Sequence, residues 1–277
     1  MIHNEYKWKS HDGIMLYAQE WRPESKPQAV INYVHGFKEH SSRFRKWAER
    51  FAASGYAVMA FDLRGHGHSE GRRGYARHYN DIIGDIYVFL SQSREAFPDV
   101  NHVLYGHSMG GNLVTNYLIR NRDLPDAAII ASPWFRLAQP PSFLKMAMAQ
   151  IIRIILPTLT IAGDLDINAL SRDPSVARDY KNDPLVHNMI RPKLFFEVES
   201  YGMKASRSIY RINIPLLVIH GTNDQLCSYK QTLNFVMNAG KRTTFREWTG
   251  AYHELHNEIN EQEIFAFVMN WLKSTLH

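Results

Sequence analysis

The sequence predicts an α/β fold, a mostly parallel and doubly wound sheet that carries an inserted helical cap. Two observations predict it. Short apolar runs alternate with amphipathic helical patterns over residues 29–131, and the same alternation returns over residues 214–272. Unbroken apolar runs are typical of parallel strands that helices bury on both faces, and the interruption between the two blocks indicates an insertion.

The chain opens with a predicted hairpin, in which two apolar segments flank His11-Asp12-Gly13. An Asp-Gly pair between two such segments is typical of a tight hairpin turn. The elements that follow are, in chain order, a strand at 29–34, a helix at 44–53, a strand at 56–61, a helix at 82–97, a strand at 103–105, a helix that includes 113–118 and a strand at 127–131. The second block supplies a strand at 214–219, a helix at 232–237, a strand at 243–248 and a closing helix at 261–272.

Residues 133–211 break this pattern, because they contain prolines, a strongly apolar helical stretch at 143–156 and no clean strand. We therefore expect residues 1–132 and 212–277 to form the core and residues 133–211 to form a cap. In a doubly wound sheet, ligands bind beyond the carboxyl ends of the strands. The insertion begins at that edge, so we expect the cap to cover a binding site.

Composition narrows the classes of protein to consider. The chain has 277 residues and a formal charge of +5, with basic residues that are scattered rather than clustered, so we expect no binding of nucleic acid. The single cysteine, Cys227, fits a reducing compartment, and the first residues lack the apolar segment of a signal peptide. Residues 146–162 are strongly apolar, but Gln150, Arg153 and Pro157 interrupt them, which argues against a membrane span. We expect a cytoplasmic protein.

The most informative motif is Gly-His-Ser-Met-Gly at residues 106–110, directly after a predicted strand and directly before a predicted helix. Gly-x-Ser-x-Gly in that setting is typical of the nucleophile elbow of serine hydrolases. A strand that turns sharply into a helix holds the central serine in a strained conformation, and the two glycines clear the space around the turn. Ser108 is therefore the candidate nucleophile.

A serine hydroxyl becomes a good nucleophile when a base takes its proton and a carboxylate orients that base. Asp224 follows one predicted strand of the second block and His253 follows the next, so both lie at the same sheet edge as Ser108. Aspartates in such loops are more often turn formers or helix caps, and Glu197 and Glu199 are alternative acids. The order Ser, Asp, His along the chain favours Asp224 and His253.

The oxyanion of an acyl-transfer reaction needs two preorganised donors. One is the N–H of Met109, and we expect the other to be the N–H of Phe37, after the strand at 29–34, where Gly36 lets the backbone approach closely. His66 and His68 raise the alternative of a metal site, but their spacing matches no helical zinc pattern. We expect neither a metal ion nor a cofactor.

Six stretches, spread over nearly the whole chain, resemble a known family. They are His35-Gly36-x-x-Glu39-His40-Ser41-x-Arg43, Asp62-x-x-Gly65-His66-Gly67-x-Ser69-Glu70-Gly71, Gly106-His107-Ser108-Met109-Gly110-Gly111, Asn182-Asp183-Pro184-Leu185, Gly221-x-x-Asp224-x-Leu226-Cys227 and Tyr252-His253-x-Leu255-His256-x-Glu258. With them the chain resembles the α/β-hydrolases of the monoacylglycerol lipase and lysophospholipase type, which are also grouped with the serine aminopeptidase S33-like hydrolases.

The resemblance implies the same three catalytic residues and the same two backbone donors. It also implies a polar floor for a glycerol-like head group, matched here by Glu39, Arg43 and His256, whose side chains can bond to free hydroxyls. Tyr180 matches a tyrosine of the family's cap near the site. A structural ion pair at a helix start is the alternative for Glu39 and Arg43. Phe37 stands where mammalian members of the family often have a small residue.

The cap helix predicted at 143–156 is apolar on too many sides for an ordinary surface helix. Its apolar residues are Phe143, Leu144, Met146, Met148, Ile151, Ile152, Ile154, Ile155 and Leu156. One side can pack on the core while another, with Ile151 and Ile155, lines an acyl tunnel or makes transient contact with a membrane surface. A simply well-buried helix explains the same pattern.

Together these features predict a serine esterase that acts on lipid monoesters, with a monoacylglycerol as the expected substrate and no nucleic-acid partner. A lysophospholipase is one alternative. An S33-type aminopeptidase is another, and it needs acidic cap residues for the substrate's amino group, for which Asp164, Asp166, Glu197 and Glu199 are available. A binding protein without catalytic activity on the same scaffold is the third.

Overall fold

The fold is built on one eight-stranded sheet in a computed structural model that describes residues 1–120, 123–163 and 165–276. The strand order is β1-β2-β4-β3-β5-β6-β9-β10, and β2 alone among these strands runs against the others. The strands are β1 (Ile2–Lys9), β2 (Met15–Arg22), β3 (Ala29–Val34), β4 (Ala57–Phe61), β5 (Asn101–His107), β6 (Ala127–Ala131), β9 (Leu216–Gly221) and β10 (Thr243–Trp248). The predicted fold class, including the hairpin β1–β2, is confirmed.

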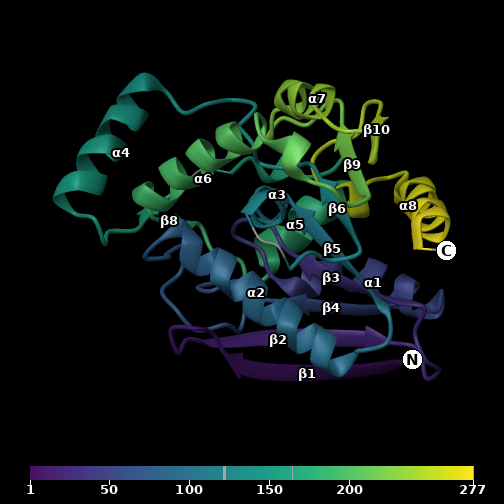
Figure 1. Ribbon diagram of the computed structural model, residues 1–277. Helices are drawn as coiled ribbons and strands as arrows, with labels where there is room; N and C mark the ends of the chain where they lie inside the picture. The colour runs from purple at the N-terminus through teal and green to yellow at the C-terminus, as the bar shows by residue number, and fades with distance from the viewer. Residues whose placement is uncertain (121–122, 164, 277) are drawn as a thin grey trace.

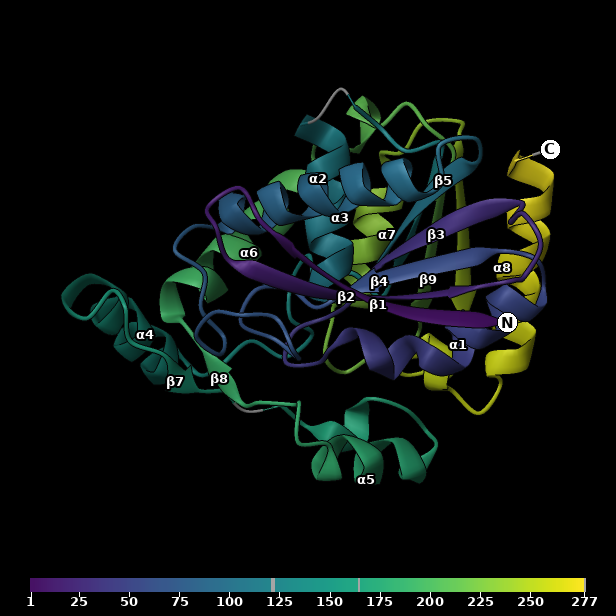
Figure 2. The ribbon, with the colours of Figure 1, turned by 90° about the horizontal axis from the view of Figure 1, so that it is seen from below.

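Helices cover both faces of this sheet (Figure 2). Apolar side chains of α2, α3 and α7 pack in one core, and those of α1 and α8 pack in a second core on the other face. These helices are α1 (Arg45–Ala53), α2 (Tyr79–Ala96), α3 (Met109–Arg120), α7 (Tyr229–Met237) and α8 (Glu261–Leu276). The central strands are buried on both sides, which explains why their sequences are continuous apolar runs.

The predicted insertion leaves the sheet after β6 and returns at β9, and these two strands are hydrogen-bonded neighbours. It contains α4 (Phe143–Ile155), α5 (Pro174–Asn182), α6 (Pro192–Ala205) and two strands of two residues each, β7 (Ile161–Ala162) and β8 (Met189–Ile190). Within the described residues, this small antiparallel pair adds two strands to an insertion that was predicted to be helical. Short 3-10 turns complete the chain at Ser41–Phe44, Ile167–Ala169, Ile209–Arg211 and Leu255–Asn257.

Helix α4 lies at the outer end of the molecule, and α6 lies between it and the core (Figure 1). No side chain of α4 is fully buried, and Phe143 is 88% exposed. The alternative of a well-buried cap helix is therefore wrong, because one face of α4 has no protein neighbour. Within the described residues, every helix is too short or too polar to span a bilayer.

Candidate active site

Ser108 lies at the junction of β5 and α3, where the chain turns sharply from strand to helix. Its φ angle is +55°, in the left-handed region that a residue with a side chain rarely adopts. A Cβ atom at Gly106 would lie 2.4 Å from Gly110 O, and one at Gly110 would lie 2.1 Å from Val34 O. The two glycines are therefore required by backbone atoms that cannot move aside, which is the steric role that the motif predicts.

Asp224 and His253 approach each other from the loops after β9 and β10. His253 Nδ1 lies 2.7 Å from Asp224 Oδ2, and both side chains are buried. The other oxygen, Oδ1, accepts the N–H groups of Leu226 and Cys227 at 2.8 and 2.9 Å. These bonds fix the carboxylate so that it holds the imidazole in one orientation.

A second imidazole, His220, contacts the same carboxylate and was missed by the sequence reasoning. Its Nε2 lies 3.0 Å from Asp224 Oδ2, and its Nδ1 lies 2.9 Å from Thr232 Oγ1. The available signal was a histidine within the otherwise apolar strand β9, four residues before Asp224. His220 thus orients the aspartate from behind.

The buried charges adjust the acidity of this pair in opposite directions. Burial raises the pKa of the Asp224 carboxyl, but the facing rings of His253 and His220 outweigh that effect and hold the pKa below its ordinary value. Burial lowers the pKa of His253, whereas the charge and hydrogen bond of Asp224 raise it by more, so that it lies above its ordinary value. A more basic imidazole is a better acceptor for the hydroxyl proton of a serine.

Ser108 and His253 line the same cavity, which has a volume of about 680 Å³ between the core and the cap. Ser108 Oγ lies 3.9 Å from Cys227 Sγ in its wall. Most of the lining is apolar and comes from the cap, including Trp134, Leu137, Met146, Met148, Ile152, Ile161, Leu165, Ile190 and Phe195. The cavity can therefore bury an apolar chain next to the hydroxyl of Ser108.

Gly36 lies beside Ser108, the candidate nucleophile, and Phe37 lines the same cavity as Ser108. A Cβ atom at Gly36 would lie 2.9 Å from the Ser108 Cβ, so only glycine allows this approach. Among the residues that the structure describes, the N–H groups of Phe37 and Met109 have no hydrogen-bond acceptor. Two free donors beside a serine hydroxyl are what an oxyanion hole requires.

The polar end of the cavity is built from Glu39, Arg43 and Glu254. Glu39 and Glu254 line the cavity, and Arg43 lies behind them, where its Nη2 donates to both oxygens of Glu254 at 2.9 and 2.8 Å. Arg43 Nε lies 3.4 Å from Glu39 Oε2. Burial and the neighbouring Glu254 raise the pKa of Glu39 to about 7. The alternative of a structural ion pair thus holds for Arg43, while Glu39 also faces the cavity.

Glu254 is a further residue of the site that the sequence did not predict. His256, which was predicted to belong to the polar floor, lies elsewhere. His256 does not line the cavity, because its ring is buried among aromatic side chains such as Phe44 and Trp47. Tyr180 does line the cavity, and its ring lies over the Arg43 guanidinium at 4.7 Å.

Two cap residues predicted to bind substrate lie elsewhere in the structure. Ile151 and Ile155 are 56% and 69% exposed, and neither lines the cavity. Residues four apart share one face of a helix, so Met148 and Ile152 turn toward the cavity while Ile151 and Ile155 turn toward the outside. The sequence showed that α4 is apolar all round but not which face meets the core.

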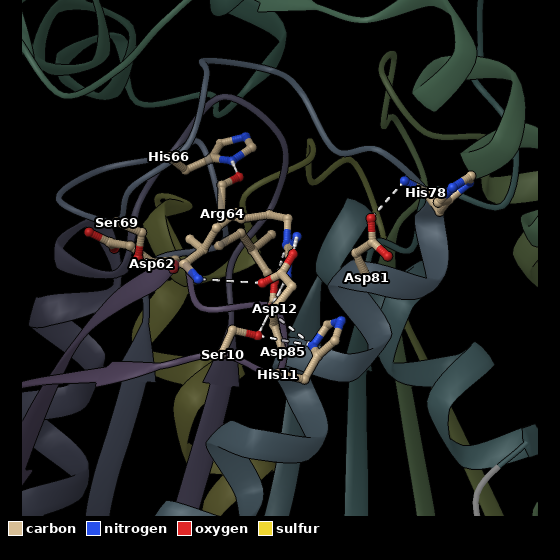
Figure 3. A network of polar contacts seen from close by, with 12 residues as sticks. Ser10, His11, Asp12, Asp62, Arg64, His66, Ser69, His78, Asp81 and Asp85 are labelled. Carbon is tan, nitrogen blue, oxygen red and sulfur yellow. Dashed lines mark hydrogen bonds and ion pairs between the residues drawn. The ribbon is translucent and has the colours of Figure 1, made fainter.

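The loop after β4 fixes the architecture beneath the site (Figure 3). Arg64 pairs with the buried carboxylate of Asp85 on α2 and with Asp12 in the β1–β2 turn, at 2.5 and 2.7 Å. Asp62 accepts the N–H groups of Ser41 and His68, each at 2.7 Å. These bonds tie the hairpin, α2 and the segment after Gly36 to one loop.

Three of the four acidic cap residues that an aminopeptidase would use have structural partners among the described residues. Glu199 accepts bonds from Trp134 and Leu137, and Glu197 accepts the N–H of Tyr79. Asp166 caps a 3-10 turn by accepting the N–H of Asn168 at 3.0 Å. Asp164 lies outside the described residues.

Comparison with known proteins gives one family and several close relatives. A family model described as serine aminopeptidase, S33 matches residues 25–260. A monoacylglycerol lipase of Mycolicibacterium smegmatis is 29% identical over 99% of this chain and 98% of its own length. The crystal structure of a monoacylglycerol lipase from Paleococcus ferrophilus has a TM-score of 0.85 at 30% identity, covering 94% of this chain and 99% of that one.

A further relative is much longer than this chain. It is an uncharacterised abhydrolase domain-containing protein of Dictyostelium discoideum, 32% identical over 94% of this chain, and the chain spans 28% of that protein's length.

Proposed function

Since the chain belongs to the serine aminopeptidase S33 family of α/β-hydrolases, we propose that it is a serine esterase that hydrolyses monoacylglycerols to fatty acid and glycerol. The observation that carries the proposal is the contact between Asp224 and His253 at the wall of the cavity that Ser108 also lines. In this reading Ser108, Asp224 and His253 form the catalytic triad, and the N–H groups of Phe37 and Met109 form the oxyanion hole.

The reaction then proceeds through an acyl-enzyme. His253 takes the proton of Ser108 as Oγ attacks the ester carbonyl carbon, and the two backbone donors stabilise the oxyanion. The ester C–O bond breaks, and His253 returns the proton to the leaving glycerol oxygen. Water, deprotonated by His253, then attacks the acyl carbon. The bond between that carbon and Ser108 Oγ breaks, His253 returns the proton to Oγ, and the fatty acid is released.

The two ends of the cavity support a lipid monoester with a small hydroxylated head. The apolar wall from the cap accepts the acyl chain, and Glu39 and Glu254 can accept hydrogen bonds from free glycerol hydroxyls. Arg43 is already paired with both carboxylates, which leaves it little capacity for a phosphate group and disfavours a lysophospholipid. The structural partners of Asp166, Glu197 and Glu199 disfavour an aminopeptidase that would use these residues.

We propose in addition that residues 133–211 act as a cap domain and that the outer face of α4 contacts a lipid surface. The support is the row of exposed apolar side chains on that face, which comprises Phe143, Leu144, Ile151, Ile154 and Ile155, followed by the exposed Leu156 directly after the helix. Exposed apolar patches on this scale mark interaction sites. A cavity that opens beside such a face can receive its substrate from a bilayer without passing it through water.

Three measurements test the proposed function. Wild-type protein should hydrolyse monoolein and react with a fluorophosphonate probe, and Ser108→Ala should lose both properties by several orders of magnitude. Lysophosphatidylcholine and an aminoacyl-naphthylamide should be poor substrates. Full activity of Ser108→Ala, or cleavage of the naphthylamide in preference to monoolein, would contradict the proposal. Absence of any reaction between the wild type and the probe would instead favour a binding protein without catalytic activity.

A further inference from the structure

The loop at residues 36–40, which carries the Phe37 N–H, lies between the core and the cap, and both sides bind it. Within the loop, the Gly36 N–H donates to Glu39 Oε1 at 2.5 Å. On the core side, Ser41, which follows the loop directly, donates its N–H to Asp62. On the cap side, three separate contacts reach the same loop. We name this segment, residues 36–40, the oxyanion loop.

Lys38 makes two of the cap contacts. Its Nζ donates to the carbonyl oxygen of Gly163, and its own carbonyl oxygen accepts the N–H of His187 at 3.4 Å. Lys38 also has a φ angle of +68°, a left-handed conformation that disfavours residues with a side chain. A lysine remains in this conformation only when its surroundings hold it, and contacts from the cap are part of those surroundings.

Asp183 makes the third contact, from the Asn-Asp-Pro-Leu motif at the end of α5. Its Oδ2 lies 2.8 Å from His40 Nε2, and its Oδ1 accepts the Leu185 N–H at 2.9 Å. One oxygen of Asp183 is therefore held within its own turn, while the other contacts His40 of the oxyanion loop. This bond gives the motif a direct connection from the cap to the oxyanion loop.

Phe37 itself is held by rings on both sides of the cavity. Its ring contacts His66 of the core, with a centroid distance of 5.9 Å, and Trp134 and His187 of the insertion, at 5.9 and 6.1 Å. A shift of this part of the cap therefore moves the residue whose N–H is the proposed oxyanion donor.

We propose that Lys38 and Asp183 are positioning residues, through which the cap holds the Phe37 N–H in the place where it stabilises the oxyanion. The inference rests on the proposed function, because it takes Ser108 as the nucleophile. Its consequence is that the cap affects the chemical step as well as the binding of substrate. Loss of one oxyanion donor typically lowers kcat by about 10² to 10³, so partial displacement of Phe37 should lower it by about 10-fold.

The test uses Lys38→Met and Asp183→Asn in the full chain, each assayed with p-nitrophenyl butyrate and with a trifluoromethyl ketone that forms a tetrahedral adduct on the serine. Each variant should lower kcat by about 10-fold with KM changed less than about threefold. Affinity for the ketone should fall in parallel with kcat, whereas affinity for the product butyrate should not change. Lys38→Arg, which keeps a cationic donor, should recover most of the activity.

Arg72→Ala is the matched control. Arg72 Nη1 donates to Thr158 O of the insertion at 3.0 Å, so this variant loses a contact with the same insertion that does not touch the oxyanion loop. It should leave kcat, KM and ketone affinity near their wild-type values.

Three outcomes would overturn the inference. In the first, Lys38→Met and Asp183→Asn raise KM while kcat stays within about twofold of the wild type. In the second, Arg72→Ala lowers kcat as much as they do, which would indicate a general loss of cap packing. In the third, the wild type does not react with a fluorophosphonate, which also removes the proposed function. The first two outcomes leave the proposed function standing.

Discussion

Replacing Arg43 with methionine should destabilise the protein by about 3–5 kcal/mol at pH 8, because the substitution leaves buried carboxylates without their counter-charge. The Arg43 side chain is only 8% exposed, and it pairs with Glu254 and Glu39, which are 2% and 4% exposed. Methionine has similar length and fills the space with little change in packing. The loss therefore measures the uncompensated charge rather than a cavity. For a chain of this size it corresponds to a fall in Tm of roughly 5–10 °C.

The pH dependence of this loss has a definite sign. In the wild type, burial raises the pKa of Glu254, but Arg43 lowers it by more, so the net shift is downward. Without Arg43 its pKa in the folded state should rise above the unfolded value of about 4.3. A carboxyl whose folded pKa is raised destabilises the fold only above its unfolded pKa. The deficit of the variant should therefore be small near pH 5 and grow by up to about 1.4 kcal/mol per pH unit above it.

Urea unfolding of the wild type and of Arg43→Met at pH 5 and pH 8 measures both the loss of stability and its dependence on pH. Arg45→Met is the control, because Arg45 pairs with Glu49 but is 70% exposed, and its loss should stay below about 1 kcal/mol. Adding Glu254→Leu to Arg43→Met should recover part of the stability. A loss below about 1 kcal/mol for Arg43→Met, or an equal loss at the two pH values, would show that uncompensated buried charge does not cause the destabilisation.

Three further predictions concern the site and the cap. Asp224→Asn should lower kcat by about 10⁴. The activity of the wild type should fall as the pH drops through the raised pKa of His253. Because Asp224 raises that pKa, the fall in activity should occur at lower pH in the variant. Gly110→Ala should lower the free energy of unfolding by about 1–3 kcal/mol in urea and should abolish most of the activity, because its Cβ would lie 2.1 Å from a backbone carbonyl oxygen. A variant as stable as the wild type would contradict this prediction. Ile151→Ser and Ile155→Ser should leave hydrolysis of p-nitrophenyl butyrate unchanged but slow hydrolysis of monoolein in vesicles by about tenfold each, unless the outer face of α4 stays in water.

The central strands could be predicted closely because they are buried on both faces, and the predicted strands at 29–34 and 127–131 match β3 and β6 at both ends. The strand predicted at 243–248 also matches β10, although β10 lies at the sheet edge and is only partly buried. Helix starts were less accurate, since they depend on polar residues. The helix predicted from residue 82 begins at Tyr79, where the Asp81 carboxylate accepts the His78 N–H at 2.8 Å and so sets the first turn.

Some site residues could also be predicted from the local sequence pattern, whereas others depend on contacts between residues that are distant in the chain. Ser108, Asp224 and His253 could be nominated from chain order and sheet edge, because both are properties of the local pattern. Glu254 could not, since its partner Arg43 is 211 residues away in the chain and nothing near it indicates that pairing. Helix α4 shows a different limit. Its apolar composition predicted contact with the core, an acyl chain or a membrane, but only the packing of α6 against one side of α4 decides which residues face the cavity.

The insertion between neighbouring strands also has a consequence for synthesis of the protein. Strand β6 pairs with β5 on one side, but its partner on the other side, β9, begins at residue 216, whereas β6 ends at residue 131. At about 5–20 residues per second the ribosome therefore leaves this edge of β6 unpaired for roughly 4–17 seconds. During that interval the nascent chain presents an apolar, parallel sheet edge that other nascent chains can pair with. The yield of native protein should therefore depend on translation speed and on chaperones that shield this edge. A circular permutant that opens within the cap and joins the natural termini makes β6 the last strand of the sheet to emerge, so it meets a completed β9 at once.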